Sequence, residues 1–444
     1  MVACINYRVG LWFMLVAALL GDPVRKLTEG QPYLISAAFA LVFFIVFFKL
    51  LAAKKGGHSI FFYFPRFKRP LNLFLIIVAI NAIRPLLVSF AFLPFVAYGL
   101  IQYTGWAVAI MAGFYLIDRE ENVIKFAKAY MVTVTPFLLT VLPHLWGLQD
   151  QWPVLKTMEI GATGWIYYPK SGGTLTLLNG IFRFPEVMGW HAMTAATCAL
   201  FILFRVKKQV FWRIFSSSLF LYGTFCALVS GRRKFLVGIA LFIALFLVLA
   251  MRKNIKKMVG YIAVLIVLVG IGWFYTQQAR VDSYLETGEA GLRDASSEYQ
   301  RRAVGSIVWA LRRDGFFGRG IGATAQGVRH VAGSDDMTGG AGIESGSGKF
   351  VSDLGVPGLI ILGVLMLTFL KSIYIMLSRK SALKINSITV IFLLSIVMIN
   401  MVSFTLSHQI YADPLIGLLT GFEVGFLLAV PKMSEYAHHK LKEG

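Results

Sequence analysis

Long apolar runs separated by short polar connections recur along the whole chain. Runs of about the length of a membrane-spanning helix occupy residues 8–20, 33–51, 71–88, 95–117, 129–146, 187–204, 211–229, 235–251, 259–275, 355–377, 386–404 and 414–430. About 20 consecutive apolar residues cross a bilayer as an α-helix, and the strict alternation typical of a transmembrane barrel is absent from the sequence. The pattern predicts an all-α polytopic membrane protein with about twelve transmembrane helices.

Composition strengthens this prediction. Hydrophobic residues make up 57% of the chain and charged residues only 15%, and the mean hydropathy is +0.70. A soluble domain cannot bury so much hydrocarbon, so we expect residues 1–444 to form a single integral membrane domain. Residues 11–20 resemble the apolar region of a signal peptide, but the following "LLGDPVRKL" lacks a cleavage pattern, which favours a first membrane span.

The net charge of +21 is explained by topology. The connections and tails on the side of the two termini hold 24 Lys and Arg, and the short connections on the other side hold 9. Cytoplasmic loops carry such an excess, so both termini are expected in the cytoplasm. Residues 276–350 form one long loop between spans nine and ten, with 9 basic and 9 acidic residues, on the outer side. A nucleic-acid partner is not expected.

The cysteines give no sign of a disulfide framework or a metal cluster. Cys4, Cys198 and Cys226 all fall in or beside apolar runs, and no pair lies in a long polar loop. We expect neither a metal nor a cofactor.

Three adjacent cations on the outer side break the charge bias. In "LVSGRRKFLVG", Arg232, Arg233 and Lys234 form the short turn between spans seven and eight. Cations are costly near the apolar core of a bilayer, by roughly 2.5–3.5 kcal/mol each at its centre. One interpretation is that these side chains extend to the lipid headgroups; the other is that they bind an anion at the outer surface.

The segment before span six carries a second cation on the same side. In "FRFPEVMGWHAM", Arg183 and Glu186 lie just ahead of the span, and His191 falls in its first turns. Pro185 suits the first turn of a helix. The segment is either an ordinary helix start or part of a polar site that includes Arg183 and His191.

The outer loops contain further candidate features. Aromatic residues between spans five and six indicate either an interfacial belt or a surface on which sugar rings stack. In the long loop, "RRAVGSIVWALRRDG" predicts a surface helix with Arg301 and Arg302 at its head. A glycine-rich turn, "GFFGRGIGATAQG", contains Arg319 but lacks the pattern of a nucleotide-binding loop. The segment "ESGSGKFVSDLGVPG", with Glu344 and Lys349, leads into span ten.

These pieces occur in an order that resembles a known family. The "FRFPEVMGW" segment, the "SGRRKFL" turn, the loop helix with "GFFGRGIG", and "ESGSGKFVSDLGVPGLI" together cover residues 180–360. With twelve spans, they resemble the bacterial O-antigen polymerase and O-antigen ligase superfamily (Wzy and WaaL types), which also includes exopolysaccharide polymerases. The resemblance implies a GT-C-like fold and a metal-independent glycosyltransferase in the inner membrane, with its active site on the periplasmic face.

The resemblance also implies a substrate and roles for individual residues. The donor would be an oligosaccharide linked to undecaprenyl diphosphate, whose diphosphate the family's outer arginines hold. By position, these arginines correspond to Arg232 with Arg233 beside it, to Arg183, and to Arg301 or Arg302. We also expect Lys234, Arg319 and Lys349 to bind the diphosphate or the substrate, because they lie on the same side. Membrane lipids surround the protein, and the resemblance allows for a chain-length regulator protein as a partner.

A general base must take the proton of the acceptor hydroxyl. Glu344 is our first candidate and His191 the second. Ligases of the family typically carry a histidine near the end of the long loop, where this chain has Glu344, which favours a polymerase of O-antigen or exopolysaccharide repeat units. Two alternatives stay open: a ligase that passes the glycan to a different acceptor, and a twelve-span flippase or transporter of the lipid-linked glycan.

Overall fold

The computed structural model describes residues 7–28, 34–53, 58–155, 166–167, 175–206, 208–251, 300–322, 345–378 and 385–443. In this part of the chain, 7 helices are long and apolar enough to cross a membrane. The bent pair Pro414–Leu428 and Val430–His438 brings the number to 8 if the pair is one span. The chain is an α-helical, multi-pass membrane protein, as its apolar pattern predicts.

Every predicted span except 259–275, which lies outside the described residues, falls on a helix. The number of spans and the side on which the termini lie stay predictions. The helices concerned are α2 (Tyr7–Leu27), α3 (Leu34–Ala53), α5 (Lys68–Val88), α6 (Leu93–Leu116), α7 (Glu120–Leu139), α9 (Pro185–Arg205), α10 (Val210–Val229), α11 (Arg233–Met251), α17 (Gly346–Ser378), α18 (Ser387–Leu406) and α19 (Pro414–Leu428).

Shorter elements connect these helices. They are α4 (Ile60–Tyr63), η1 (Pro65–Phe67), η2 (Phe90–Phe92), α8 (Val141–Leu145), η3 (Leu148–Asp150), η4 (Pro153–Leu155), η5 (Gln300–Gly305), α15 (Ser306–Asp314), η8 (Gln409–Ala412) and α20 (Val430–Glu443). Two strands of two residues each, β1 (Ile166–Tyr167) and β2 (Leu175–Thr176), pair antiparallel. They are a small exception to the helical fold.

The chain divides into two compact units. Unit 1 consists of Met1–Lys49, Glu120–Asp294 and Asn386–Ile399, and unit 2 of Leu50–Arg119, Ala295–Ile385 and Asn400–Gly444. The expected single integral domain stays a prediction.

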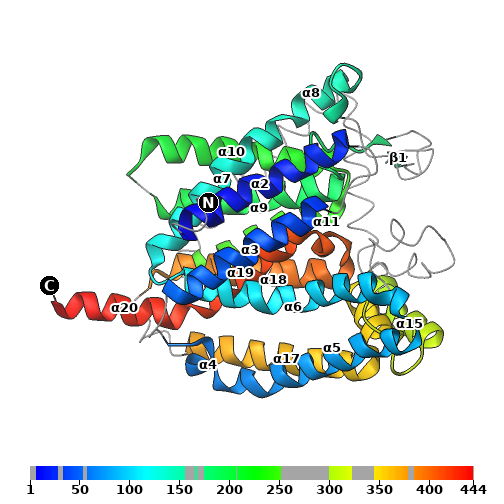
Figure 1. The fold of residues 1–444 in the computed structure, drawn as a ribbon. Helices are drawn as coiled ribbons and strands as arrows, with labels where there is room; N and C mark the ends of the chain where they lie inside the picture. Colours follow the sequence, from blue (N-terminus) through cyan, green and yellow to red (C-terminus); the bar gives the residue numbers. More distant parts are fainter. Residues whose placement is uncertain are drawn as a thin grey trace. The chain divides into compact units, whose positions relative to one another are not determined.

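Helix α9 is the buried centre of unit 1 and packs along α10 (Figure 1). Its sequence carries small and apolar residues around the whole helix, so neighbouring helices can approach from several sides. A Cβ on Gly223 of α10 would stand 2.9 Å from the carbonyl oxygen of Ala192. Gly189 leaves room for the ring of Phe235 in α11 in the same way. Because the helices pack this closely, the start of α9 lies next to the turn between α10 and α11.

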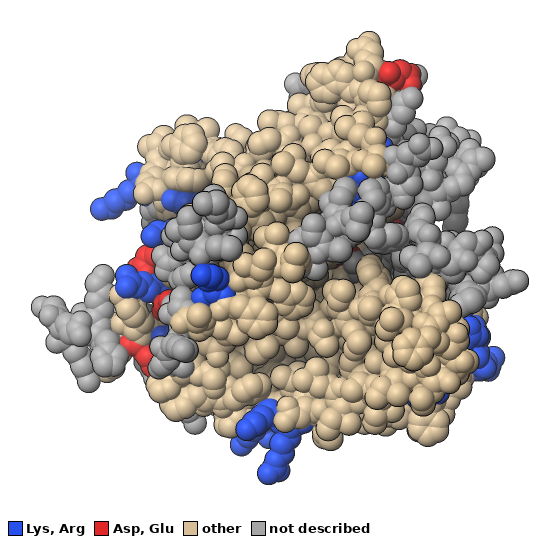
Figure 2. All heavy atoms as spheres, viewed as in Figure 1, with Lys and Arg blue, Asp and Glu red and all other residues tan. Residues whose placement is uncertain are grey.

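In unit 2, helices α6 and α19 run side by side (Figure 1). Gly417, Gly421 and Gly425 recur every fourth residue on α19, a spacing that lets two membrane helices pack closely. A Cβ on Gly421 would collide with Ala109, and one on Gly425 with the carbonyl of Ile110. Figure 2 shows that the described surface over α5 and α6 is mostly uncharged, with Lys and Arg gathered near α4 and α15.

The last residues of the expected long loop, 276–350, are helical. Helix α17 begins at Gly346, well before the predicted start of span ten at 355. The hydroxyl of Ser345 explains the early start, because it accepts the N–H of Gly348 at 3.0 Å, as an N-terminal cap does. Gly355, at φ 71°, then interrupts the helix.

The predicted loop helix is confirmed, since η5 and α15 together cover Gln300–Asp314. The glycine-rich turn that follows is fastened to the rest of unit 2. The N–H of Arg319 donates to Ser352 O at 2.7 Å and that of Ile321 to Asn81 O at 3.0 Å. Arg84 donates to Phe317 O at 2.7 Å. The backbone N–H groups of Arg319 and Ile321 therefore donate to carbonyl groups of the protein itself, and these two groups do not form an anion-binding site.

Candidate functional site

The clearest polar arrangement in unit 1 lies at the N-terminal end of α9. Nη2 of Arg232, in the turn just before α11, is 2.6 Å from Oε1 of Glu186. Both side chains are half-buried, with exposed fractions of 28% and 13%. Glu186 lies in the first turn of α9, where the helix dipole favours a negative charge. The structure thus provides a guanidinium next to a carboxylate at the ends of apolar helices.

Arg183 belongs to the same helix end, directly before α9. Its backbone N–H donates to Oδ2 of Asp22, in α2, at 3.1 Å. Its guanidinium carbon lies 4.7 Å from the centre of the Phe184 ring. Two of the residues predicted to contact the diphosphate, Arg183 and Arg232, are therefore attached to the start of one helix.

Two buried polar groups hold the segment that leads into α9. Nδ1 of His144 accepts the N–H groups of Asn179 and Gly180 at 3.4 and 3.2 Å, so this nitrogen carries no proton. Nζ of Lys26 donates to Gly180 O at 2.9 Å and to Val154 O at 3.1 Å. Burial lowers the pKa of Lys26 to about 7, and Asp22 opposes the shift. The position of the α9 start is thus determined by α2, α8 and η4.

His191, the second candidate base, lies inside the packing of unit 1. It is 1% exposed, and its Nδ1 is 2.8 Å from the hydroxyl of Tyr130. The ring of Phe182 stacks on it at 5.3 Å between centres. A substrate hydroxyl could reach this imidazole only if the packing opened, so the geometry favours a structural role.

The other cations of the turn are less informative. Lys234 lies in the first turn of α11, with Nζ 5.2 Å from the centre of the Phe235 ring. Arg233 is the first residue of α11, and its side chain lies outside the described part.

Unit 2 holds two predicted substrate contacts, and each is paired with a carboxylate. Nε of Arg319 is 2.7 Å from Oδ1 of Asp314, a fully buried group. Nζ of Lys349 is 2.7 Å from Oδ2 of Asp353, which also accepts the hydroxyl of Tyr103 at 2.8 Å. Lys349 is buried, and its ammonium group contacts Asp353 one turn further along α17.

The structure does not describe the side chains of three further predicted residues. Glu344, our first candidate base, falls in the segment 323–344. The backbone of Arg301 and Arg302 forms part of η5, but their side chains are not among those described. The roles of all three stay predictions.

Glu186 is the residue that sequence reasoning missed. It stands next to Pro185, a pattern typical of a helix start, and this ordinary interpretation concealed its contact with Arg232. Its Oε2 is buried and, within the described residues, accepts no hydrogen bond. The sequence could have indicated Glu186, because it is a carboxylate on the same predicted side of the membrane as the turn that contains Arg232.

The described residues hold no group of three or more His, Cys, Asp and Glu side chains that could bind a metal ion. Cys198 and Cys226 are buried free thiols.

A scan against protein-family models and a search of curated protein sequences each find no match to this chain.

Proposed function

We propose that this protein is a glycosyltransferase that polymerises oligosaccharide repeat units linked to undecaprenyl diphosphate. The proposal combines the order of the segments in residues 180–360, which resembles that of the O-antigen polymerase and ligase superfamily, with the chemistry at the start of α9. In this proposal the site faces the periplasm of a bacterial inner membrane.

One observation carries the proposal: the 2.6 Å pair of Arg232 and Glu186 at the ends of apolar helices. A guanidinium matches the oxygens of a diphosphate in a bidentate way and stays charged at all physiological pH values. A half-buried position strengthens its interaction with an anion compared with bulk water. Lipid diphosphates present their charge at the membrane surface, which is where the ends of these helices are expected to lie.

The proposed reaction needs an acid–base group beside the cation. The acceptor hydroxyl would lose its proton to Glu186 and attack C1 of the donor sugar. The bond between C1 and the diphosphate oxygen would break, and the electron pair would leave with undecaprenyl diphosphate, whose charge Arg232 and Arg183 stabilise. Among the described residues Glu186 is a further candidate for the base, beside Glu344, the first candidate from the sequence.

The polymerase is favoured over the ligase by the sequence near the end of the long loop. Glu344 stands where ligases of the family typically carry histidine. Product type separates the two functions: a ladder of lengths on undecaprenyl diphosphate indicates a polymerase, and glycan on a different acceptor indicates a ligase.

The test uses purified protein in nanodiscs with a lipid-linked oligosaccharide donor. We expect Arg232→Gln and Arg232→Lys both to abolish chain elongation, because an ammonium group cannot replace the bidentate guanidinium. Lys432→Gln is the matched control, since Lys432 also forms a partly buried ion pair, at 2.8 Å with Asp118. Normal-length polymer from folded Arg232→Gln protein would overturn the proposal.

A buried carboxylate supports a second candidate, a transporter of lipid-linked glycan. Glu423 lies near the middle of the predicted span 414–430 and is buried. Nδ2 of Asn400 donates to its Oε2 at 2.7 Å. Ionisable groups inside membrane spans often mark transport pathways. If Glu423→Gln stops movement of a labelled donor across liposomes, and the wild type forms no glycosidic bond, the transporter is correct.

A further inference from the structure

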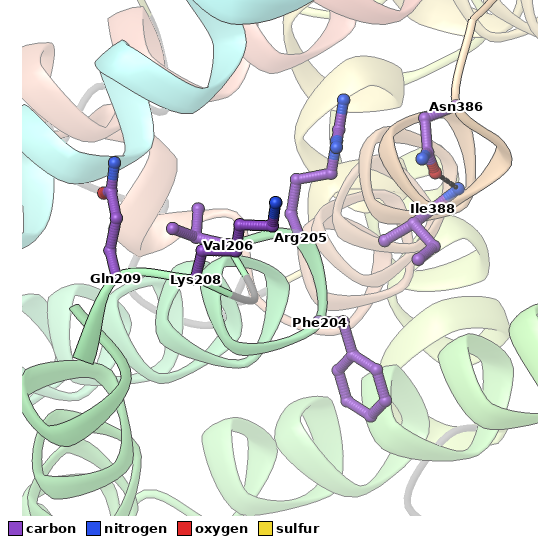
Figure 3. Close-up of a pocket in the computed structure, with 7 residues that line it drawn as sticks. All are labelled: Phe204, Arg205, Val206, Lys208, Gln209, Asn386 and Ile388. Atoms are coloured by element: carbon purple, nitrogen blue, oxygen red, sulfur yellow. Dashed lines mark hydrogen bonds between the residues drawn. The ribbon is translucent and has the colours of Figure 1, made fainter.

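The opposite end of α9 contains a pocket that the proposed glycosyl transfer does not use. Its cavity, of about 430 Å³, is lined by Phe204, Arg205, Val206, Lys208, Gln209, Asn386 and Ile388, all of unit 1 (Figure 3). The residues come from the end of α9, the connection to α10 and the start of α18. This volume falls within the range of small-ligand sites.

The charges around the pocket favour an anion. Nε of Arg205 is 2.9 Å from Oε1 of Glu120, so these two charges compensate each other. Lys208 adds an exposed positive charge on the wall. Nζ of Lys128 donates to Oε1 of the lining residue Gln209 at 2.9 Å and adds a further positive charge next to it. Cations therefore outnumber carboxylates among the described groups at this position.

The side-chain oxygen of Asn386 already accepts a hydrogen bond, which leaves its NH₂ group as a donor for a ligand. Its Oδ1 accepts the N–H of Ile388 at 2.9 Å, the dashed line in Figure 3, which caps the start of α18. Its backbone N–H is directed to Glu120 Oε2 at 3.3 Å. Asn386 lines the pocket, and its side-chain NH₂ group is a hydrogen-bond donor.

The surface next to the pocket is apolar and exposed. Helix α10 begins directly after Gln209, and Val210, Phe211 and Ile214 are 68%, 68% and 64% exposed. In a membrane protein such a helix face contacts acyl chains. A lipid whose chains lie along this face would have its headgroup beside Lys208.

We propose that this pocket binds the phosphate headgroup of an anionic phospholipid. The cations bind the phosphate, Asn386 donates to it, and the start of α10 contacts the acyl chains. Basic pockets between membrane helices on the cytoplasmic side bind anionic headgroups in this way, and the pocket lies at the end of α9 that is expected to face the cytoplasm. The proposal is independent of glycosyl transfer.

The test is native mass spectrometry of the full-length protein, titrated with phosphatidylglycerol or phosphatidylcholine in detergent. We expect saturable binding of phosphatidylglycerol in preference to phosphatidylcholine, weakened about tenfold by Lys208→Gln through loss of a charge-assisted contact. Arg213→Gln is the matched control, because Arg213 is an exposed cation one helical turn into α10 that does not line the pocket. Both positions are exposed, so neither variant should disturb folding.

Two results would overturn the proposal. Equal weakening by Lys208→Gln and Arg213→Gln would mean that the lipid responds only to overall charge. Displacement of phosphatidylglycerol by inorganic phosphate at similar concentrations would mean that the site recognises free phosphate and that the acyl chains contribute nothing. Retention of phosphatidylglycerol in excess phosphate, together with a specific loss in Lys208→Gln, supports the lipid site.

Discussion

Glu186, in the first turn of α9, and Arg232, in the turn before α11, lie 2.6 Å apart between Oε1 and Nη2. The pair connects two segments that the sequence presents as separate motifs. It also gives the guanidinium a carboxylate partner from the protein itself. In the proposed reaction, a diphosphate that binds Arg232 competes with this carboxylate and releases it to accept a proton.

The first prediction concerns that proton. Glu186→Gln keeps the size of the side chain but removes the base, so kcat should fall by on the order of a hundredfold or more, while the KM for the lipid-linked donor changes little. Steady-state assays measure both constants. Glu435→Gln, in a surface pair with Tyr63, is the control, and wild-type kcat in Glu186→Gln would exclude Glu186 as the base.

The second prediction concerns Lys26, whose pKa burial lowers to about 7. An unfolded lysine has a pKa near 10.4, so between these values the unfolded state binds more protons than the folded state. The stability of the wild type relative to Lys26→Met should therefore rise with pH from about 7 to about 10. Thermal unfolding in detergent at several pH values measures this difference. A difference that is constant or falls with pH would contradict the lowered pKa.

The third prediction concerns helix packing in unit 2. A Cβ on Gly421 meets Ala109 of α6, so Gly421→Ala should destabilise the protein by about 1–3 kcal/mol through overpacking. Gly363 of α17 has open space around it, and Gly363→Ala should be neutral or slightly stabilising, because alanine favours helix. Thermal unfolding of the two variants tests the contrast. Equal melting temperatures would mean that α6 and α19 do not pack through this glycine.

The fourth prediction separates a structural role of Lys349 from substrate binding. Asp353→Asn leaves the buried ammonium without its charged partner and should cost about 3–5 kcal/mol. The double variant Lys349→Met with Asp353→Leu removes both charges and should recover part of that stability, because the buried hydroxyl of Tyr103 still loses its acceptor. The transferase activity of the double variant separates the two roles of Lys349. Retained activity supports a structural role for the pair. Loss of activity in a stable double variant would indicate that Lys349 contacts the substrate.

The sequence by itself determined the fold class and most of the helices. An apolar run of about 20 residues predicts a membrane helix, because the free energy of transfer of a helix into lipid is a local property. It depends only on residues that are neighbours in the sequence. For the same reason the periodicity of "RRAVGSIVWALRRDG" predicted the helix that η5 and α15 form. The early start of α17 was less visible, because a cap at Ser345 and a break at Gly355 depend on single residues.

The tertiary structure alone decided which polar groups meet. The packing of α9 against α10 and α11 brings Glu186 to Arg232, and its packing against α7 encloses His191 beside Tyr130. Each of these contacts depends on close approaches between helices, such as that of Gly223 to Ala192. Such approaches follow from shape and volume across the fold, so no local pattern could show whether a given cation faces a substrate or a carboxylate of the protein.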